Sequence, residues 1–230
     1  MFSTPWMVFV SSSLFCGGTL ITSRFVLTAA HCITNDYTTV RLGEYALNNT
    51  GLYCINNECI PKANEIEVDW KIVHAGYNAE NVINDIALLR MGREVQFTLF
   101  VKPICLLVNE HMETVSQFNI TGWGQTENAK FSNILKTAVV HSVDLWFCST
   151  KYNSSIYQSQ ICAGSDTSDA CIGDSGGPLS ADINYNGLVI PLQFGIVSYG
   201  SDNCNSFSVY TKVSNYMDWI VDAIQHYGVI

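Results

Sequence analysis

The stretch Asp169-Ala170-Cys171-Ile172-Gly173-Asp174-Ser175-Gly176-Gly177-Pro178 presents one serine among glycines, beside an acid and close to a cysteine. Glycine has no side chain, so backbone N–H groups in such a loop can approach a ligand closely. A serine hydroxyl is a weak nucleophile at neutral pH and needs a base, which a third group orients. The stretch therefore predicts a nucleophile, Ser175, on a tight loop, provided that the other two groups occur elsewhere in the chain.

Candidates for both groups lie upstream. His31 follows an apolar run at residues 27–30 and precedes Cys32, so small neighbours and a cysteine hold its ring in place. Asp85 stands before another apolar run, where a buried carboxylate needs a partner such as an imidazole N–H. Taken singly, a histidine, an acid before a strand or a glycine-rich loop is more often structural. The three motifs together, in the order His, Asp, Ser, favour a catalytic triad.

With their surrounding residues, these motifs resemble the trypsin and chymotrypsin family of serine peptidases, and most of all the catalytic domains of arthropod clip-domain proteases. The resemblance covers essentially the whole chain. It implies an all-β fold of two six-stranded antiparallel β-barrels, about 1–104 and about 105–230, with a C-terminal α-helix and the site between the barrels. It also implies that Ser175 attacks a peptide carbonyl, that His31 accepts its proton, that Asp85 orients His31, and that the N–H groups of Gly173 and Ser175 bind the oxyanion.

The residue pattern itself is also typical of an all-β chain, because short apolar runs alternate with turn residues. Strands are expected over residues 6–10, 18–21, 25–27, 39–42, 66–73, 86–90, 134–143, 188–198 and 208–213. Helical periodicity is clear only at the end, behind Ser214 or Asn215 as the cap. One face of that helix carries Tyr216, Trp219, Ile220, Ala223 and Ile224. A shorter helical turn is expected over residues 144–152.

Composition excludes several classes of protein. The 230 residues are 48% apolar and 13% charged, which suits a sizeable core and excludes a disordered chain. Eleven basic residues against 20 acidic ones give a net charge of −9, without a basic block that could follow a phosphate backbone, so nucleic acid is not an expected partner. Polar residues interrupt every apolar stretch within about ten residues, so no membrane span is predicted.

The resemblance also assigns residues to a substrate pocket. Asp169, six residues before the nucleophile, falls at the base, where a carboxylate favours an Arg or Lys side chain of the substrate. Ser198, Tyr199 and Gly200 match the segment that pairs with the substrate backbone, with Tyr199 in place of the usual tryptophan. Ser208 stands where trypsin-like members carry glycine, and we expect its side chain to narrow the pocket and to change the preference between Arg and Lys. The implied partners are protein or peptide substrates cleaved after Arg or Lys, and protease inhibitors.

Family members are activated by a cut that frees an apolar N-terminus, whose amine pairs with the acid beside the nucleophile, here Asp174. The opening residues 1–6 align just downstream of that cut, and they do not form a secretion signal, because no basic residue precedes Arg24. We therefore expect the natural protein to carry an upstream signal and pro-region. Without the amine, we expect a zymogen-like, poorly formed oxyanion site.

Nine cysteines indicate disulfides in an oxidising compartment, and hence a secreted, extracellular protein. Three N-glycosylation triplets, at Asn48, Asn119 and Asn153, support secretion, and Asn119 is the least suited because it lies on an expected strand. The resemblance implies the pairs Cys16–Cys32, Cys54–Cys59, Cys148–Cys162 and Cys171–Cys204. Cys105 is left over, either as a tether to the upstream pro-region or as a buried free thiol.

No cofactor is required by this chemistry. Glu44 begins a loop that binds calcium in some relatives, with Glu65 or Glu67 as further ligands, and a plain solvated acidic loop is the alternative.

Two other functions compete with a peptidase. A non-catalytic homologue would serve as a binding or adaptor module, but such proteins usually lose a residue of the triad. A small-ester or lipid hydrolase would carry Gly-x-Ser-x-Gly on a strand-to-helix turn, a pattern that residues 173–177 also satisfy. The order of the triad and the β-rich chain argue against that hydrolase class.

Overall fold

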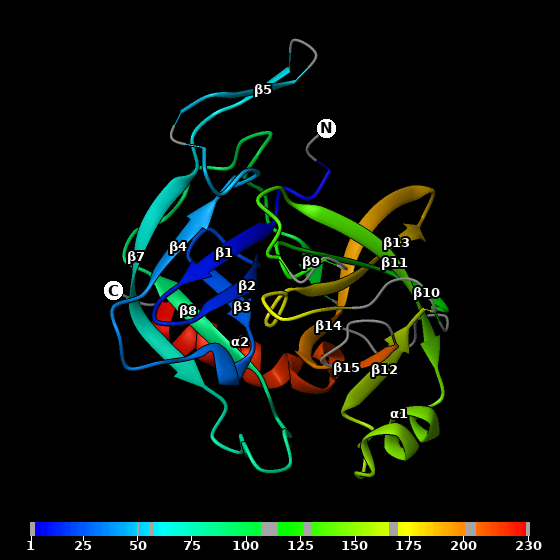
Figure 1. The fold of residues 1–230 in the computed structure, drawn as a ribbon. Coiled ribbons are helices and arrows are strands. Elements are labelled where there is room, and N and C mark those ends of the chain that lie inside the picture. Colours follow the sequence, from blue (N-terminus) through cyan, green and yellow to red (C-terminus); the bar gives the residue numbers. More distant parts are fainter. Residues whose placement is uncertain are drawn as a thin grey trace.

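The computed structural model describes residues 3–49, 51–55, 58–106, 115–126, 130–165, 170–200 and 206–228. Two β-barrels lie side by side, the first from the N-terminal half of the chain and the second from the C-terminal half (Figure 1). The all-β, two-barrel fold that the sequence predicts is confirmed.

Six antiparallel strands close the first barrel in the order β1-β2-β3-β8-β7-β4. They are β1 (Met7–Ser11), β2 (Phe15–Leu20), β3 (Phe25–Thr28), β4 (Thr39–Leu42), β7 (Asn64–Val73) and β8 (Ala87–Met91). In β7, Ile66, Val68 and Ile72 are buried while Glu65 and Glu67 are exposed. Successive side chains of a strand point to opposite faces, so this alternation gives β7 one face inside the barrel and one in solvent.

The second barrel consists of β10 (Gln117–Gly122), β11 (Lys136–Val143), β12 (Gln160–Gly164), β13 (Pro178–Tyr185), β14 (Leu188–Tyr199) and β15 (Phe207–Lys212). Their order is β13-β10-β11-β12-β15-β14, and the pairing of β13 with β14 closes the ring. The short β9 (Cys105–Leu106) adds a seventh, parallel strand beside β14. Asn186 and Gly187, both with positive φ, make the two-residue turn that joins β13 to β14.

A two-stranded hairpin, β5 (Tyr53–Ile55) and β6 (Glu58–Ile60), projects above the first barrel (Figure 1). A disulfide between Cys54 and Cys59, which are opposite each other in its register, joins the two strands.

The structure describes two α-helices, α1 (Leu145–Tyr152) and α2 (Met217–Gly228). The expected cap of the last helix is wrong: Ser214 and Asn215 lie within a 3₁₀ turn, η2 (Val213–Tyr216), and α2 begins only after it. The i to i+3 bonds of a 3₁₀ turn wind the chain more tightly than an α-helix. The turn buries Val213 and Tyr216 against the core before the α-helix starts.

The C-terminal helix belongs to the core of the first barrel, although it follows the second barrel in the sequence. Ile220 and Ala223 of α2 are buried in the same apolar cluster as Val8, Leu27 and Leu88. A separate cluster, which includes Phe9 of β1 and Trp123 after β10, joins the two barrels, with the two rings edge to face at 5.6 Å. These contacts fix the position of the two barrels relative to each other, and therefore also the positions of the residues that each barrel contributes to the site.

No helix in the described ranges is long and apolar enough to span a bilayer.

Candidate functional site

His31 lies in a short 3₁₀ turn, η1 (Ala30–Cys32), directly after β3. The disulfide between Cys16 and Cys32 anchors this turn to β2, so the segment on either side of His31 is held in the barrel wall. His31 donates its backbone N–H to Oδ1 of Asp85 at 2.9 Å, and its Nδ1 lies 2.8 Å from Oδ2 of the same carboxylate. Two contacts to one carboxylate fix both the position and the orientation of the imidazole.

Asp85 is completely buried, which by itself raises the pKa of its carboxyl group. Hydrogen bonds from His31 and Ser198 and the charge of His31 outweigh that effect and hold the pKa of Asp85 below its ordinary value. Ser198 donates its Oγ hydrogen to Oδ2 at 2.5 Å. The carboxylate is therefore ionised at neutral pH and accepts hydrogen bonds from donors of both barrels.

The backbone around Asp85 is held by residues that the sequence analysis did not single out. Thr211 of β15 donates to the carbonyl oxygen of Asp85 at 2.8 Å. Asn84 takes a left-handed conformation with φ of 53°, and its side chain bonds to Tyr216 at 2.9 Å and to Gly76 at 2.7 Å. Asparagine tolerates that conformation better than most residues, which is the one sequence signal that could have identified it.

Ser175 lies on a loop that requires glycine at position 176, because a side chain there would clash with its neighbours and because the backbone φ is positive. A Cβ on Gly176, with φ of +79°, would lie 2.2 Å from Thr28 Oγ1. Gly17 of β2 donates its N–H to the carbonyl oxygen of Ser175 at 2.7 Å, and Gly176 donates to Val197 at 2.8 Å. The loop is thus fastened to the first barrel on one side and to β14 on the other.

Among the described residues, Ser175 Oγ makes no hydrogen bond to His31, whose Nε2 lies 3.8 Å from Cys32 Sγ. Catalytic hydrogen bonds are often long before substrate binds. The N–H groups of Gly173 and Ser175 donate to no acceptor within the described ranges, and Gly173 has φ of +97°. These two donors are free to bind an anion beside the serine hydroxyl.

Asp174 is half-buried as a residue, but its carboxylate is enclosed. It accepts the N–H of Gly124 at 2.8 Å and that of Cys171 at 3.0 Å. Burial raises the pKa of Asp174 to about 6, although these two hydrogen bonds act in the opposite direction. A Cβ on Gly122 or Gly124 would fall within 2.3 Å of the carboxylate oxygens. In the described part of the chain, no cationic side chain is ion-paired with Asp174.

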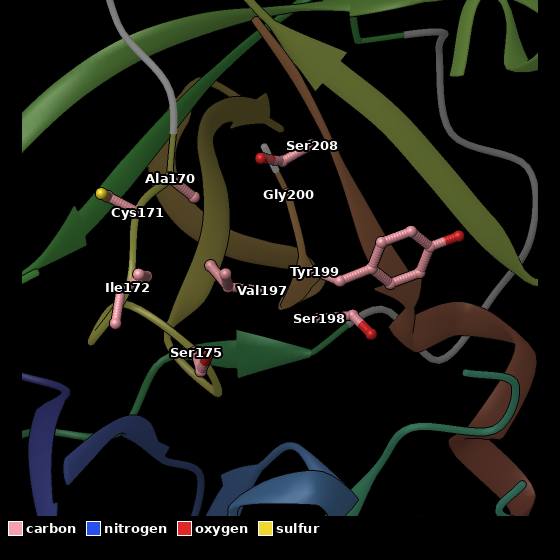
Figure 2. Close-up of a pocket in the computed structure, with 9 residues that line it drawn as sticks. All are labelled: Ala170, Cys171, Ile172, Ser175, Val197, Ser198, Tyr199, Gly200 and Ser208. Carbon is pink, nitrogen blue, oxygen red and sulfur yellow. The ribbon is translucent and has the colours of Figure 1, made fainter. Parts of the chain in front are cut away.

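A pocket opens next to Ser175, with Ser175 at one end and Ser208 at the other (Figure 2). Its lining combines the loop around Ser175 with β14 and β15: Ala170, Cys171, Ile172, Ser175, Val197, Ser198, Tyr199, Gly200 and Ser208. Ser208 is fully buried and its Oγ has no hydrogen-bond partner in the described residues. A Cβ on Gly200 would lie 2.3 Å from that oxygen, so the pocket is narrow there. Asp169, the expected base of the pocket, lies outside the described residues.

Three disulfides match the implied pairs: Cys16–Cys32, Cys54–Cys59 and Cys148–Cys162. Cys171 is also disulfide-bonded, and its expected partner, Cys204, lies outside the described residues. Cys105 is a free thiol and is exposed, so the alternative of a buried free thiol is wrong. Its place on the edge strand β9 explains the exposure.

The predicted calcium ligand Glu44 is buried, whereas two of the three predicted glycosylation sites are exposed. Glu44 is buried and ion-paired with Arg41 at 3.2 Å, and burial raises the pKa of its carboxyl group despite that charge. A carboxylate already paired with a guanidinium does not suit a calcium ligand. Asn48 and Asn153 are exposed, whereas Asn119 is half-buried on β10.

One cluster of metal-ligating residue types occurs in the described ranges, formed by Cys16, His31 and Cys32. The disulfide between its two sulfurs removes both thiolates, so this cluster does not fit a metal ion.

The chain matches the family described as Trypsin over residues 1–220. It is 37% identical over 249 residues to Serine protease grass of Drosophila melanogaster, covering 98% of this chain and 66% of that protein. It is 36% identical over 255 residues to Spaetzle-processing enzyme of the same organism, covering 96% of this chain and 63% of that protein. The chain thus spans about two thirds of the length of the first relative and less of the second.

Two solved structures resemble the fold. The crystal structure of the Drosophila Grass clip serine protease of the Toll pathway has a TM-score of 0.87 and 35% identity, covering 97% of this chain and 69% of that one. Neuropsin, a serine protease of mouse brain, has a TM-score of 0.80 and 31% identity, covering 97% of this chain and 96% of that one.

Proposed function

This chain belongs to the trypsin family of serine peptidases, and we propose from that membership that it is an endopeptidase with Ser175, His31 and Asp85 as its triad. The observation that carries the proposal is the pair of contacts, at 2.9 and 2.8 Å, that hold His31 on the buried carboxylate of Asp85. A histidine fixed in this way on one ring nitrogen can present the other to a nucleophile.

In the proposed reaction, Ser175 Oγ attacks the carbonyl carbon of the scissile peptide bond while His31 Nε2 accepts the hydroxyl proton. His31 then donates that proton to the leaving amine, and water hydrolyses the acyl-enzyme by the same steps. Asp85 stabilises the imidazolium that forms, because its carboxylate stays ionised at neutral pH. Ser198, from the other barrel, keeps Asp85 in place through its hydrogen bond.

The N–H groups of Gly173 and Ser175 are the proposed oxyanion donors. Neither group is engaged elsewhere in the described part of the chain, so both are available to the tetrahedral intermediate. One such donor contributes about 3 to 4 kcal/mol in serine peptidases where it has been removed.

The proposed cleavage site follows Arg or Lys, with Asp169 as the carboxylate that binds the substrate cation. The pocket bounded by Ala170, Gly200 and Ser208 supports a side chain that enters between the nucleophile loop and β14. The side chain of Ser208, in place of glycine, narrows this entry and disfavours the broad guanidinium relative to the slimmer ammonium.

We propose an extracellular role in a proteolytic cascade. The disulfides suit an oxidising compartment, and the relatives include a Spaetzle-processing enzyme and a protease of the Toll pathway. Protein substrates and protease inhibitors are the proposed partners.

The exposed thiol of Cys105 is proposed to form a disulfide with a cysteine of an upstream pro-region. A Cys105→Ser change would then release that segment in a non-reducing gel.

The test of the proposed function is hydrolysis of a tripeptide p-nitroanilide with Arg at its cleaved end. We expect turnover by the unchanged protein and a loss of at least about 10³-fold in kcat for Ser175→Ala. Ser12→Ala, in a β1–β2 turn, is the matched control and should leave kcat unchanged. Equal rates for the unchanged protein and Ser175→Ala would contradict the proposal.

A second function, a zymogen-like or non-catalytic binding module, is favoured by two observations. Ser175 is not hydrogen-bonded to His31, and the carboxylate of Asp174 is enclosed without a cation in the described residues. Covalent labelling of Ser175 by a peptidyl phosphonate separates the two functions. A binding module would remain unlabelled, and a zymogen would become labelled only after a cut supplies a free amine for Asp174.

A further inference from the structure

The segment that leads into Asp85 has an unusual backbone conformation. It connects β7 to β8 and runs below the first barrel in the view of Figure 1. Val82 in this segment has φ of 46°, and Asn84, two residues later, has φ of 53°. Asparagine tolerates the left-handed region, but a β-branched residue such as valine is rarely found there. A residue strained in this way persists only where its surroundings hold it.

Val82 is the last residue of a tight turn. The backbones of Asn78 and Ile83 bond to each other in both directions, at 3.1 and 3.3 Å. The side chain of Asn78 accepts the N–H groups of Glu80 and Asn81 at 2.9 and 3.0 Å. Turns favour glycine or asparagine where φ is positive. Because valine stands there instead, the conformation depends on a contact from outside the turn.

Gln160 of β12 supplies that contact from the second barrel. Its Nε2 donates to the carbonyl oxygen of Val82 at 3.2 Å, and its Oε1 accepts the N–H of Tyr157 at 2.9 Å. A hydrogen bond with Gln160 also acts to lower the pKa of Tyr199, although burial raises that pKa overall. Gln160 is only 5% exposed. A buried amide is costly without partners, so these bonds are maintained in the folded protein.

Gln160 and Thr211 bind the same segment side by side. They are opposite each other in the register of β12 and β15. Thr211 donates to the carbonyl oxygen of Asp85 at 2.8 Å, three residues after Val82. The backbone N–H of Gln160 donates to the carbonyl oxygen of Tyr157 at 2.9 Å, which fixes the start of β12. Two neighbouring side chains of the second barrel therefore hold two carbonyl oxygens of one segment of the first barrel.

We propose that Gln160 is a positioning residue, which keeps Val82 in its left-handed conformation and thereby holds the segment that carries Asp85. The proposal rests on the proposed function and deepens it, because it adds a residue of the second barrel that acts on the acid of the triad through the backbone. Displacement of Asp85 would change the orientation of His31, whose ring and backbone both bond to that carboxylate. The contact of Gln160 with Tyr199 gives a competing role, which is support of the pocket wall.

Gln160→Met separates these two roles, because methionine has a similar length but neither the donor nor the acceptor. Without the bond from Gln160, Val82 should relax toward negative φ and displace Asp85. We expect kcat for the tripeptide p-nitroanilide to fall by about 10- to 100-fold, as for other small displacements of catalytic groups, while KM changes by less than about twofold. Gln158→Met, in the exposed turn before β12, is the matched control and should leave both constants unchanged.

Val82→Asn tests the left-handed conformation directly, because asparagine adopts it more readily than valine does. Added to Gln160→Met, it should restore kcat to within about threefold of the unchanged protein, because the conformation then no longer depends on Gln160. A role of Gln160 in packing alone predicts no such rescue. If Gln160→Met does not fold, Gln160→Asn takes its place in every comparison, since it keeps an amide that is one methylene too short to reach Val82.

The position of His31 can also be measured without turnover. Its Nδ1 proton is hydrogen-bonded to the carboxylate of Asp85 and gives a low-field line in the proton NMR spectrum, which Asp85→Asn identifies by removing it. We expect Gln160→Met to shift or broaden this line and added Val82→Asn to restore it. Gln158→Met should leave the line unchanged.

An unchanged kcat in Gln160→Met would overturn the proposal, and so would a loss of kcat that Val82→Asn does not restore. A rise in KM with kcat unchanged would assign Gln160 to the pocket wall through Tyr199 and also overturn it. Failure of the unchanged protein to hydrolyse the tripeptide would instead count against the proposed function, while the NMR line would still decide whether Gln160 positions Asp85.

Discussion

The backbone N–H of Gly17 donates to the carbonyl oxygen of Ser175 at 2.7 Å, across the boundary between the two barrels. Gly17 follows Cys16, whose disulfide holds the turn that carries His31. The same short segment of β2 thus fixes both the proposed nucleophile and the proposed base, although these residues are 144 positions apart in the sequence. The relative position of Ser175 and His31 depends on how closely this segment approaches the nucleophile loop.

Gly17→Ala should therefore reduce activity by displacing that loop. The added Cβ would lie 3.0 Å from both the N and Cα atoms of Gly177, which are backbone atoms that cannot rotate away. We expect a loss of about 1 to 3 kcal/mol in the free energy of unfolding, as for other overpacked sites, and a fall in kcat/KM for the tripeptide substrate. Gly51→Ala is the control, because its Cβ would meet nothing within 4 Å. If Gly17→Ala and Gly51→Ala had the same free energy of unfolding in urea and the same kcat/KM, β2 would not determine the position of the loop around Ser175.

Asp85→Asn should leave the fold intact but remove most of the activity. The amide cannot accept from both the ring and the backbone of His31 while it also accepts from Ser198, so the ring loses its fixed orientation. We expect kcat to fall by about 10⁴-fold, which is the size of the effect of the same change in a serine peptidase with a Ser-His-Asp triad. Asp36→Asn, at an exposed loop, serves as the control. An unchanged kcat in the Asp85 variant would mean that this carboxylate does not orient the base.

Most strands could be predicted from the sequence because alternation and turn residues are local signals, whereas the two-barrel arrangement was implied by the resemblance to the trypsin family. The expected runs leave out β5, β6, β9, β12 and β13, and β10 was expected only as the strand around Asn119. β13 begins with Pro178 and contains Asp182 and Asn184, which are poor strand formers, and its partners β10 and β14 determine its conformation. The pairing of distant strands overrides local preference at such positions.

The proposed site could be predicted only in part. Motifs identify His31, Asp85 and Ser175, because the chemistry requires those residue types. Thr211 and Asn84 hold the backbone of Asp85 through hydrogen bonds that span the fold, and neither carries a motif of its own. The enclosure of Asp174 by Gly124 likewise depends on the packing of two loops, which sequence spacing does not show.

Ser208→Gly should widen the pocket and shift its preference. The side chain removed is fully buried, and its Oγ has no hydrogen-bond partner within the described ranges, so the loss of the hydroxyl itself costs little. We expect kcat/KM for an Arg substrate to rise by about tenfold relative to a Lys substrate, within the range for one small group in a pocket. Ser208→Ala, which removes only the hydroxyl, should give a smaller rise. An unchanged ratio of Arg to Lys cleavage in both variants would show that Ser208 does not limit the pocket.

The dependence of stability on pH should identify Asp174. Its pKa is about 6 in the folded protein against an ordinary 3.8, so the folded state holds this proton more tightly than the unfolded state does. The stabilisation is fully present below about pH 4 and is lost as pH rises through about 6, by at most about 3 kcal/mol. Urea unfolding between about pH 4 and pH 7 should show this decline in the unchanged protein and a smaller one in Asp174→Asn. Asp182→Asn, on β13, should retain the decline, since its carboxylate is not enclosed in the same way. If Asp174→Asn declined as steeply as the unchanged protein, the enclosed carboxylate would not be the group responsible.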